Sequence, residues 1–478
     1  MDLPFGTQTP ELDVLIVGAG LSGLASAVKI LSKEQSLKMK IIDENPMPGG
    51  QLGESGNRFV NSDQDQMITF LTYVQVLPHR YVPDFSSDSL RRCWDLDRGL
   101  TSLPARFELW RYINMLEIRM KKFGSKKFNL RNRGPTMERH ICNNLFFNKS
   151  RFFMFNVVEI ACGANPSDVD YDEFMVVCSS CGGLRMLIDL YFTFPSSLFE
   201  FSTRKLVDNI MEKIKFADMV MNCRATRVDH FKNYVEVSDS LGMKHTAQTV
   251  ILAIPWNKVQ KLEFNPPLPK EFQQTVKAYQ KPRRVITQFY MRYPKSYWRS
   301  QGYSGHFLSS EPLVCGRECR SGIYRGYMMH TQDEVDEVKQ TVLDLVSEYF
   351  GDEMQHPLEY QQSTFELNMA LHSPQITPWH RVIWSSSAAV GTYYRNLMGG
   401  AVQSGVRAAV SALFVIRPQV VSWKDMMDVD EKDQYAGVNV GRVRGLLSRL
   451  NLYNVTFYSV FVLGIIFILN IGYNRSVS

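Results

Sequence analysis

A glycine-rich turn near the N-terminus constrains the fold more than any other feature of the sequence. An apolar run at 14–17 (VLIV) is typical of a strand buried on both faces of a sheet. The turn at 18–23 follows directly with the pattern GxGxxG, and apolar residues then recur at helical spacing through 24–31. A strand, this turn and a helix in that order open a Rossmann-type dinucleotide-binding unit, so the sequence predicts an α/β fold.

Each glycine of the turn has a physical role in holding a dinucleotide. Gly18 allows the tight turn out of the strand, Gly20 lets the backbone approach a pyrophosphate, and Gly23 lets the helix pack closely on the strand. The helix N-terminus offers free N–H groups to the phosphates. A second apolar run at 39–42 ends in Asp43, where a carboxylate can accept the ribose hydroxyls of an adenosine. The alternative is a glycine-rich turn without a ligand, which this complete unit disfavours.

A glycine pair indicates which dinucleotide is bound. Gly49 and Gly50 follow Asp43 closely, within IIDENPMPGGQL. In flavoproteins of the glutathione-reductase class such a pair continues the dinucleotide site, whereas a plain nicotinamide enzyme is not expected to carry it. FAD is therefore favoured over NAD. A thioredoxin-reductase-like enzyme would need a second GxGxxG for NADPH, and the sequence contains none.

Three further segments carry a resemblance to a known family. The first is AIP at 253–255 followed by FNPPLP at 264–269, the second is CGANPSDVDYDEFMVVCSSCGG at 162–183, and the third is LMGGAVQSGVRAA at 397–409. With the N-terminal unit, these segments resemble the flavin-containing amine oxidases, and most closely the monoamine oxidases, from about Asp13 to Leu413. The resemblance implies a Rossmann-type FAD-binding domain interleaved with an α+β substrate domain.

The resemblance also implies the division of the chain. The FAD-binding domain is expected to use strands near 219–228, 234–237 and 249–254. The expected parts are an FAD-binding domain at 10–75, 203–265 and 380–420, a substrate domain at 76–202 and 266–379, a connector at 421–450 and a membrane helix at 451–473.

Further cofactor contacts follow from the resemblance alone. Ala225 is similar in place to a backbone contact with the adenine, and Gln51 stands where the family has an arginine. A helix beginning near Met398 resembles the last flavin-binding helix, whose positive N-terminus would face the flavin pyrimidine edge. The family attaches FAD through a cysteine upstream of that helix, but no cysteine occurs after Cys319. FAD is therefore expected to be bound non-covalently.

At the positions where the family has its catalytic residues, this sequence has different residue types. The family lysine that holds a water beside the flavin is replaced by Thr287, or by Gln288 if the gap is placed differently. One tyrosine of the pair that walls the substrate slot is replaced by Leu397. Tyr393 and Tyr394 lie a turn earlier and are candidates to replace it, although packing tyrosines are the simpler interpretation. The catalytic residues thus stay unknown at this stage.

Two hypotheses for the function follow. The first is an FAD-dependent oxidoreductase that oxidises an amine-type substrate with oxygen as acceptor. The second is a catalytically weak or silent relative that acts as a membrane-anchored binding or scaffold protein. The intact glycines and Asp43 support FAD in both hypotheses, and the changes at Gln51, Thr287 and Leu397 favour the second.

The cysteines do not indicate a metal. Cys178 and Cys181 form a CxxC pair, which leaves a redox disulfide or half a zinc site open. Two buried thiols are favoured because no second CxxC or histidine pair stands nearby. No metal is therefore expected.

Composition and charge set the expected partners. The 478 residues suggest two or three domains, and the net charge of +6 is spread without a basic block, so no nucleic acid is expected. The uncharged stretch at 455–473 is long enough to span a bilayer and predicts a tail anchor with a cytosolic body. The resemblance favours the mitochondrial outer membrane, with the endoplasmic reticulum as alternative. A small-molecule amine is the expected substrate, and a homodimer is left open.

Overall fold

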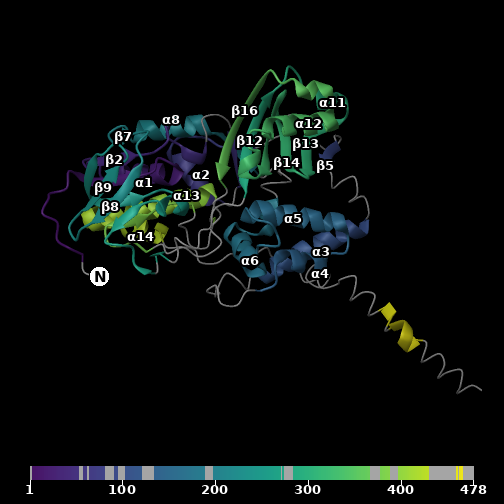
Figure 1. The fold of residues 1–478 in the computed structure, drawn as a ribbon, viewed down its shortest axis with the longest axis horizontal. Coiled ribbons are helices and arrows are strands. Elements are labelled where there is room, and N and C mark those ends of the chain that lie inside the picture. The colour runs from purple at the N-terminus through teal and green to yellow at the C-terminus, as the bar shows by residue number, and fades with distance from the viewer. Residues whose placement is uncertain are drawn as a thin grey trace, which may run out of the picture.

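The structure of the protein is a computed structural model of the 478-residue chain. It describes residues 3–52, 57–61, 64–80, 91–94, 103–120, 134–188, 198–270, 272–273, 284–366, 377–387, 394, 397–429, 459–460 and 462–466. Figure 1 shows a layered α/β unit on one side of the molecule, and a second sheet above a group of helices on the other.

An eight-stranded sheet forms the centre of the α/β unit. Its strands come from widely separated parts of the chain, and β1 pairs in parallel with both β10 and β2. The order is β11 (Glu263–Asn265), β8 (Ala225–His230), β9 (Val235–Asp239), β10 (Lys244–Leu252), β1 (Leu12–Val17), β2 (Met39–Ile42) and β7 (Asp218–Val220), with β17 (Val382–Trp384) paired to β10. The apolar run at 14–17 is therefore a central strand, which explains its complete burial.

One expected strand is divided in two. The sequence predicts a single strand near 219–228, but the structure has β7 and β8 with a turn between them. Asn222 adopts φ 57° in this turn, a left-handed conformation that asparagine tolerates and that a strand cannot contain.

Helices cover this sheet and share its core. The helix α1 (Leu21–Lys33) packs along α13 (Met398–Ile416), and their apolar faces join the strands in one buried cluster. The other elements of this unit are η1 (Gly50–Leu52), α2 (Asp65–Tyr73), α8 (Thr203–Lys213), α9 (Trp256–Val259), η6 (Pro418–Val420) and α14 (Trp423–Val429). The start of α13 agrees with the helix expected from Met398.

A six-stranded sheet separates two apolar layers. Its order is β16 (Glu359–Glu366), β12 (Val285–Arg292), β15 (Ile323–His330), β14 (Leu313–Arg320), β13 (Tyr303–Ser310) and β5 (Arg91–Trp94). One face packs against α12 (Val338–Phe350), with α11 (Tyr297–Ser300), η4 (Gln332–Glu334) and η5 (Asp352–Gln355) nearby. Alternate residues of the same strands point to the opposite face.

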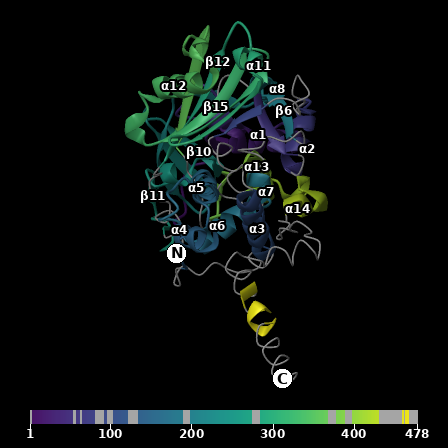
Figure 2. The same ribbon diagram turned by 90° about the vertical axis from the view of Figure 1, so that its right-hand side faces the viewer.

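That opposite face meets a layer of helices. The layer comprises α3 (Leu103–Met120), α4 (Met137–Asn144), α5 (Asn148–Cys162), α6 (Tyr171–Ser180) and α7 (Leu184–Ile188), which share a buried cluster with the sheet. A small sheet, in the order β3 (Asn57–Asn61), β6 (Leu198–Ser202) and β4 (His79–Arg80), belongs with the α/β unit through the buried side chains of β3 and β6. Figure 2 shows the α12 layer, the six-stranded sheet and the helical layer from the side.

Two helical regions bear on the membrane expectation. Among the described residues, α13 is long and apolar enough to cross a membrane by length and composition, but 72% of its apolar window is buried. Because α13 packs on α1, we assign it to the core. The expected anchor at 455–473 lies outside the described residues except for short helical stretches at 459–460 and 462–466, whose apolar side chains are exposed. These stretches lie apart from the body in both views (Figures 1 and 2).

Candidate functional site

The GxGxxG turn joins β1 to α1 at the carboxyl edge of the parallel strands. Gly18 has φ +109°, and a Cβ there would collide with the carbonyl of Ala253 at the end of β10. A Cβ on Gly23 would collide with the carbonyl of Gly18. A Cβ on Gly20, in contrast, would meet no atom within 4 Å. Two glycines are thus needed by the fold, and the third lies beside open space, as a ligand cradle requires.

Asp43 lies at the end of β2 and is tied to this turn. Its Oδ2 accepts a hydrogen bond of 2.6 Å from the backbone N–H of Ala19, and its Oδ1 accepts bonds from the backbone and side chain of Asn45. Its backbone carbonyl accepts the N–H of Cys223 at 2.7 Å, which brings Ala225 at the start of β8 close by. The expected ribose acid and the expected adenine contact therefore lie at one edge of the sheet.

The glycine pair lies directly against the turn. Gly49 donates its N–H to the carbonyl of Ala19 at 2.9 Å, and a Cβ on Gly50 would lie 3.1 Å from the Cα of Gly20. The side chain of Gln51 is exposed. The expected residues from Gly18 to Gln51 are therefore assembled as one surface.

An arginine that the sequence reasoning missed lies beside this pair. The guanidinium of Arg58, on β3, donates to the backbone carbonyls of Leu52 at 3.1 Å and Gln51 at 3.3 Å. A positive charge is therefore present next to Gln51, although it comes from a different position than in the family pattern.

The N-terminus of α13 has a protein acceptor. Gly405 packs so closely on α1 that a Cβ would collide with the carbonyl of Ser22, which shows why a small residue is needed there. In the first turn of α13, next to Met398, the backbone N–H of Gly399 donates to Oε1 of Gln64 at 3.0 Å. Gln64 is 1% exposed. The helix end that was expected to face the flavin is therefore capped by a buried side chain.

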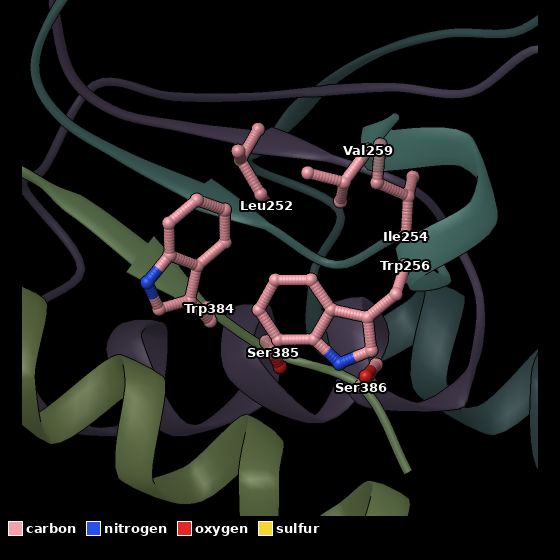
Figure 3. Close-up of a pocket in the computed structure, with 7 residues that line it drawn as sticks. All are labelled: Leu252, Ile254, Trp256, Val259, Trp384, Ser385 and Ser386. Atoms are coloured by element: carbon pink, nitrogen blue, oxygen red, sulfur yellow. The ribbon is translucent and has the colours of Figure 1, made fainter. Parts of the chain in front are cut away.

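A small pocket lies at the carboxyl ends of β10 and β17. It is too narrow to hold a water molecule and is lined by Leu252, Ile254, Trp256, Val259, Trp384, Ser385 and Ser386. Figure 3 shows the two indole rings along the pocket, with both serines at their edge. Ser22 of α1 donates to the carbonyl of Ser385 at 3.3 Å, so the pocket borders the glycine turn. The pocket is smaller than an ordinary ligand cavity. It therefore adds to the ligand-binding surface beside the glycine turn at 18–23 and does not replace that surface.

The structure separates the two candidates for the family lysine. Thr287 is fully buried on the face of β12 that α12 covers, and its hydroxyl bonds Nε2 of His330 at 2.7 Å and Oγ1 of Thr364 at 2.8 Å. Gln288 is on the opposite face, next to Tyr327 of β15, and is partly exposed. That face is shared with the helical layer. Of the two, only Gln288 is on the face that meets the helices and the small sheet.

Two more arginines share the face of Gln288. Arg317 on β14 and Arg325 on β15 are paired residues, and the ring of Phe59 on β3 lies 3.5 Å from Cζ of Arg317. Neither arginine was a candidate from the sequence. A single arginine in a strand has no distinguishing sequence pattern, and only the pairing of two strands reveals the cluster.

The tyrosine and leucine candidates lie between the two halves of the molecule. Leu397 packs against the cluster of the helical layer. Tyr394 is 3% exposed with φ 54°, and its ring lies 3.5 Å from the position of a Cβ built on Gly182. Both side chains therefore contact the helical layer. Tyr393 lies outside the described residues.

A buried group of three side chains resembles a metal site but is hydrogen-bonded throughout. Cys223 and His245 bond Oδ2 of Asp239 at 3.1 and 2.9 Å, and the N–H groups of Leu241 and Met243 bond Oδ1. Burial raises the pKa of Asp239, but these hydrogen bonds outweigh it and lower the pKa to about 2. The group holds β8, β9 and β10 together, and the expectation of no metal stays a prediction.

The comparisons with known proteins agree with this geometry. Residues 21–413 match the family model of flavin-containing amine oxidoreductases. This chain belongs to that family. A putative flavin-containing monoamine oxidase, AofH, from Mycobacterium tuberculosis is 24% identical over 83% of this chain and 96% of its own. A flavin-containing amine oxidase from Oncorhynchus mykiss is 20% identical over 87% of this chain and 89% of its own.

Solved structures show the same fold. A putrescine oxidase double mutant superimposes with a TM-score of 0.70 at 18% identity, covering 85% of this chain and 100% of that one. Cyclohexylamine oxidase from Brevibacterium oxydans gives a TM-score of 0.66 at 18% identity, with 84% and 99% coverage. As a flavin-containing amine oxidoreductase, the chain is an enzyme with FAD as its cofactor.

The residues present fit the adenosine and pyrophosphate half of FAD. The open space at Gly20 leaves room for phosphates, and the glycine pair closes one side of it. The hydroxyl of Ser385 is buried and has no hydrogen-bond partner within the described part of the chain, so it is available to a polar group of the cofactor. On the flavin-ring side, this family member has Gln64 against the helix that would meet the pyrimidine edge.

Proposed function

We propose that this enzyme binds FAD non-covalently in the cradle of Gly18, Gly20, Gly23 and Asp43, and oxidises a small amine on the Gln288 face of the six-stranded sheet. The observation that carries the proposal is the bridge made by β3. Arg58 holds the turn that follows Gly49 and Gly50, and the adjacent Phe59 contacts Arg317 of that sheet. The cradle and the sheet face are thereby adjacent, as a cofactor and its substrate must be.

The chemistry divides between the cofactor and the chain. FAD, when bound, accepts the hydride that leaves the carbon next to the amine. The protein must hold that carbon about 3–3.5 Å from the reacting atom and exclude water. Gln288 offers an amide that can hold substrate or a water by hydrogen bonds, and oxygen is proposed as the final acceptor. An amide cannot stabilise a developing negative charge as an ammonium can, so we expect slow reoxidation.

Absorption spectroscopy of the purified, FAD-loaded protein tests this proposal. Acid precipitation should release all flavin into the supernatant, because no cysteine after Cys319 is available for attachment. Anaerobic mixing with an amine panel, followed by oxygen, should show slow bleaching and slow recovery with phenylethylamine or serotonin. Colour that stays in the pellet would refute the non-covalent part. Fast bleaching and prompt peroxide formation would refute the slow catalysis.

A catalytically silent relative with a binding or scaffold role is the second candidate. Two observations favour it, namely the cap that Gln64 places on Gly399 and the packing of Leu397 into the helical layer. This candidate predicts flavin binding without bleaching by any amine in the panel, so the same experiment distinguishes it from the enzyme.

The location of the enzyme is also proposed. We propose that 451–473 is a tail anchor in the mitochondrial outer membrane, with the endoplasmic reticulum as alternative. We also propose that the domains divide near the boundaries expected from the sequence, except that β4 and β6 join the FAD-binding domain with the rest of the small sheet. Support comes from the uncharged stretch at 455–473 and from Arg442, Arg444 and Arg449 on its N-terminal side. A homodimer is compatible with the proposal and is tested by the mass of the detergent-solubilised protein.

A further inference from the structure

Arg58 is a charged side chain beside the cofactor cradle that has no carboxylate partner among the described residues. One nitrogen of its guanidinium, Nη2, donates to the backbone carbonyls of Leu52 at 3.1 Å and Gln51 at 3.3 Å. Within the described part of the chain, Nε and Nη1 have no acceptor. Burial, and then repulsion from Arg325, lower the pKa of Arg58 to about 10, so the group is charged at neutral pH. The N–H groups on Nε and Nη1 are therefore available to an anionic ligand.

The segment that Arg58 holds closes one side of the cradle. The backbone N–H of Leu52 donates to the carbonyl of Gly49 at 3.2 Å, and a Cβ on Gly50 would lie 3.1 Å from the Cα of Gly20. The two carbonyls that accept from the guanidinium belong to the two residues directly after this glycine pair. The guanidinium is thus fixed to the segment that borders the open space at Gly20.

A pyrophosphate in that space requires positive charge around it. Helix α1 contributes its N-terminus, because the side chain of Gly20 offers no cap and no acidic residue lies in the first turn. Lys258 is already paired with the carboxylate of Glu44. Gln51 is neutral, although the family has an arginine at this position. Arg58 is therefore the charged group that can take over from the missing arginine.

We propose that Arg58 binds the pyrophosphate of FAD from β3, in place of the arginine that the family carries at the position of Gln51. This inference rests on the proposed function, because it adds a residue to the proposed FAD site. A guanidinium suits the role because its N–H groups match the geometry of phosphate oxygens. The next residue of the strand, Phe59, contacts Arg317 of the six-stranded sheet. The strand β3 therefore links the bound cofactor to the substrate face.

Binding of FAD and of ADP to the flavin-free protein tests this assignment. The full-length protein in detergent is titrated with each nucleotide by calorimetry. Arg58→Met should weaken both affinities by at least about tenfold and by similar factors, because ADP keeps the pyrophosphate and lacks the flavin. Arg204→Met is the matched control, because it removes the same charge from an 81% exposed side chain of the neighbouring helix α8. Both affinities should stay unchanged in that variant.

A second substitution separates phosphate binding from support of the turn. Gln51→Arg in the Arg58→Met protein should restore most of the lost affinity, since it returns a guanidinium to the position that the family uses. An arginine that only supported the turn through the carbonyls of Leu52 and Gln51 could not be replaced in this way. Arg58→Gln keeps N–H donors for those carbonyls but removes the charge, and carries the same expectation if Arg58→Met does not fold. The unfolding midpoint of each flavin-free variant shows which variants are folded.

Three results would overturn the assignment while the wild type binds FAD. They are an unchanged affinity for both nucleotides in folded Arg58→Met and Arg58→Gln, a loss for FAD without a loss for ADP, and no recovery with Gln51→Arg. The second result would assign Arg58 to the flavin half of the cofactor, and the third to support of the turn. Each of these leaves the proposed function intact. A wild-type protein that binds neither FAD nor ADP would refute the proposed function together with this inference.

Discussion

Gln64 accepts a hydrogen bond of 3.0 Å from the backbone N–H of Gly399, and this contact joins the start of α2 to the start of α13. Gln64 is buried, and a Cβ on Gly399 would lie 3.1 Å from its Oε1. The N-terminus of α13 is the helix end expected to meet the pyrimidine edge of the flavin. The side chain of Gln64 therefore accepts from an N–H group of the helix end that the resemblance assigns to the flavin.

Replacement of Gln64 by alanine should show whether Gln64 or the flavin accepts the hydrogen bond of the Gly399 N–H when FAD is bound. In FAD-free protein, Gln64→Ala leaves the Gly399 N–H without an acceptor and should lower the free energy of unfolding by about 1–3 kcal/mol. With saturating FAD the loss should be smaller, because the flavin can accept the bond. Urea unfolding with and without FAD measures both values, and Gln66→Ala on the same helix is the control. An equal loss in both states would show that the cofactor does not take over from Gln64.

Gly20 and Gly23 should respond differently to the same substitution. Gly20→Val should abolish FAD binding but change the unfolding free energy of FAD-free protein by only about 0.5 kcal/mol, because Gly20 has φ −71° and open space beyond its Cα. Gly23→Val should cost about 3 kcal/mol or more, since its Cβ would collide with the carbonyl of Gly18. Flavin fluorescence titration and circular dichroism provide the two readouts. Retention of FAD by Gly20→Val would contradict the cradle.

Thr287 and Gln288 should differ when lysine is introduced. Thr287→Lys buries an ammonium among the hydrogen bonds to His330 and Thr364, and should cost about 3 kcal/mol or more. Gln288→Lys is on the partly exposed face and should fold normally. If Gln288 is the position next to the flavin, only the second variant should speed reoxidation by oxygen in stopped-flow measurements. Faster reoxidation in a folded Thr287→Lys protein would reverse this assignment.

His230 should make stability depend on pH. Burial, and then the charges of His380 and Arg381, lower the pKa of His230 to about 4, and its ring contacts Trp379 without a hydrogen-bond partner among the described residues. Because the unfolded chain binds the proton more readily, the contribution of neutral His230 is complete above about pH 6.5 and is lost as the pH falls toward 4. Between about pH 6.5 and 4, the free energy of unfolding of the wild type should fall by up to about 3 kcal/mol more than that of His230→Phe. Urea unfolding of both proteins measures this difference. The difference between the two proteins should stay constant between pH 7 and 8, and a constant difference down to pH 4.5 would contradict the prediction.

Deletion of the chain from Asn451 onward tests the anchor. The shortened protein should be soluble without detergent and should keep its full FAD content, because the cradle and α13 lie upstream of the deletion. The full-length protein should resist carbonate extraction from membranes. Extraction of the full-length protein by carbonate would show that 455–473 is not a membrane span.

Local features of the cofactor cradle could be predicted from the sequence, because they depend on contacts between near neighbours. The turn at 18–23 follows from the backbone freedom of glycine, and the strand at 14–17 follows from its apolar run. The helix from Met398 was expected from the family resemblance and begins where it was expected. In these cases the residue type and its spacing carry the information.

The side of a strand on which Thr287 lies could not be decided in this way. A one-residue shift in the alignment exchanges Thr287 and Gln288, and successive side chains of a strand point to opposite faces. Pairing with Met328 and cover by α12 decide the question.

The sequence by itself therefore determined the family and the cofactor, since each is indicated by short continuous segments whose residue types and spacing are local properties. Only the tertiary structure brought Gln64 to Gly399, Arg58 to the turn after Gly50, and Arg317 opposite Arg325. These partners are far apart along the chain or lie on neighbouring strands, and their meeting depends on sheet order and strand register. Such long-range pairing is set by the whole core and is not encoded in any local pattern of residues.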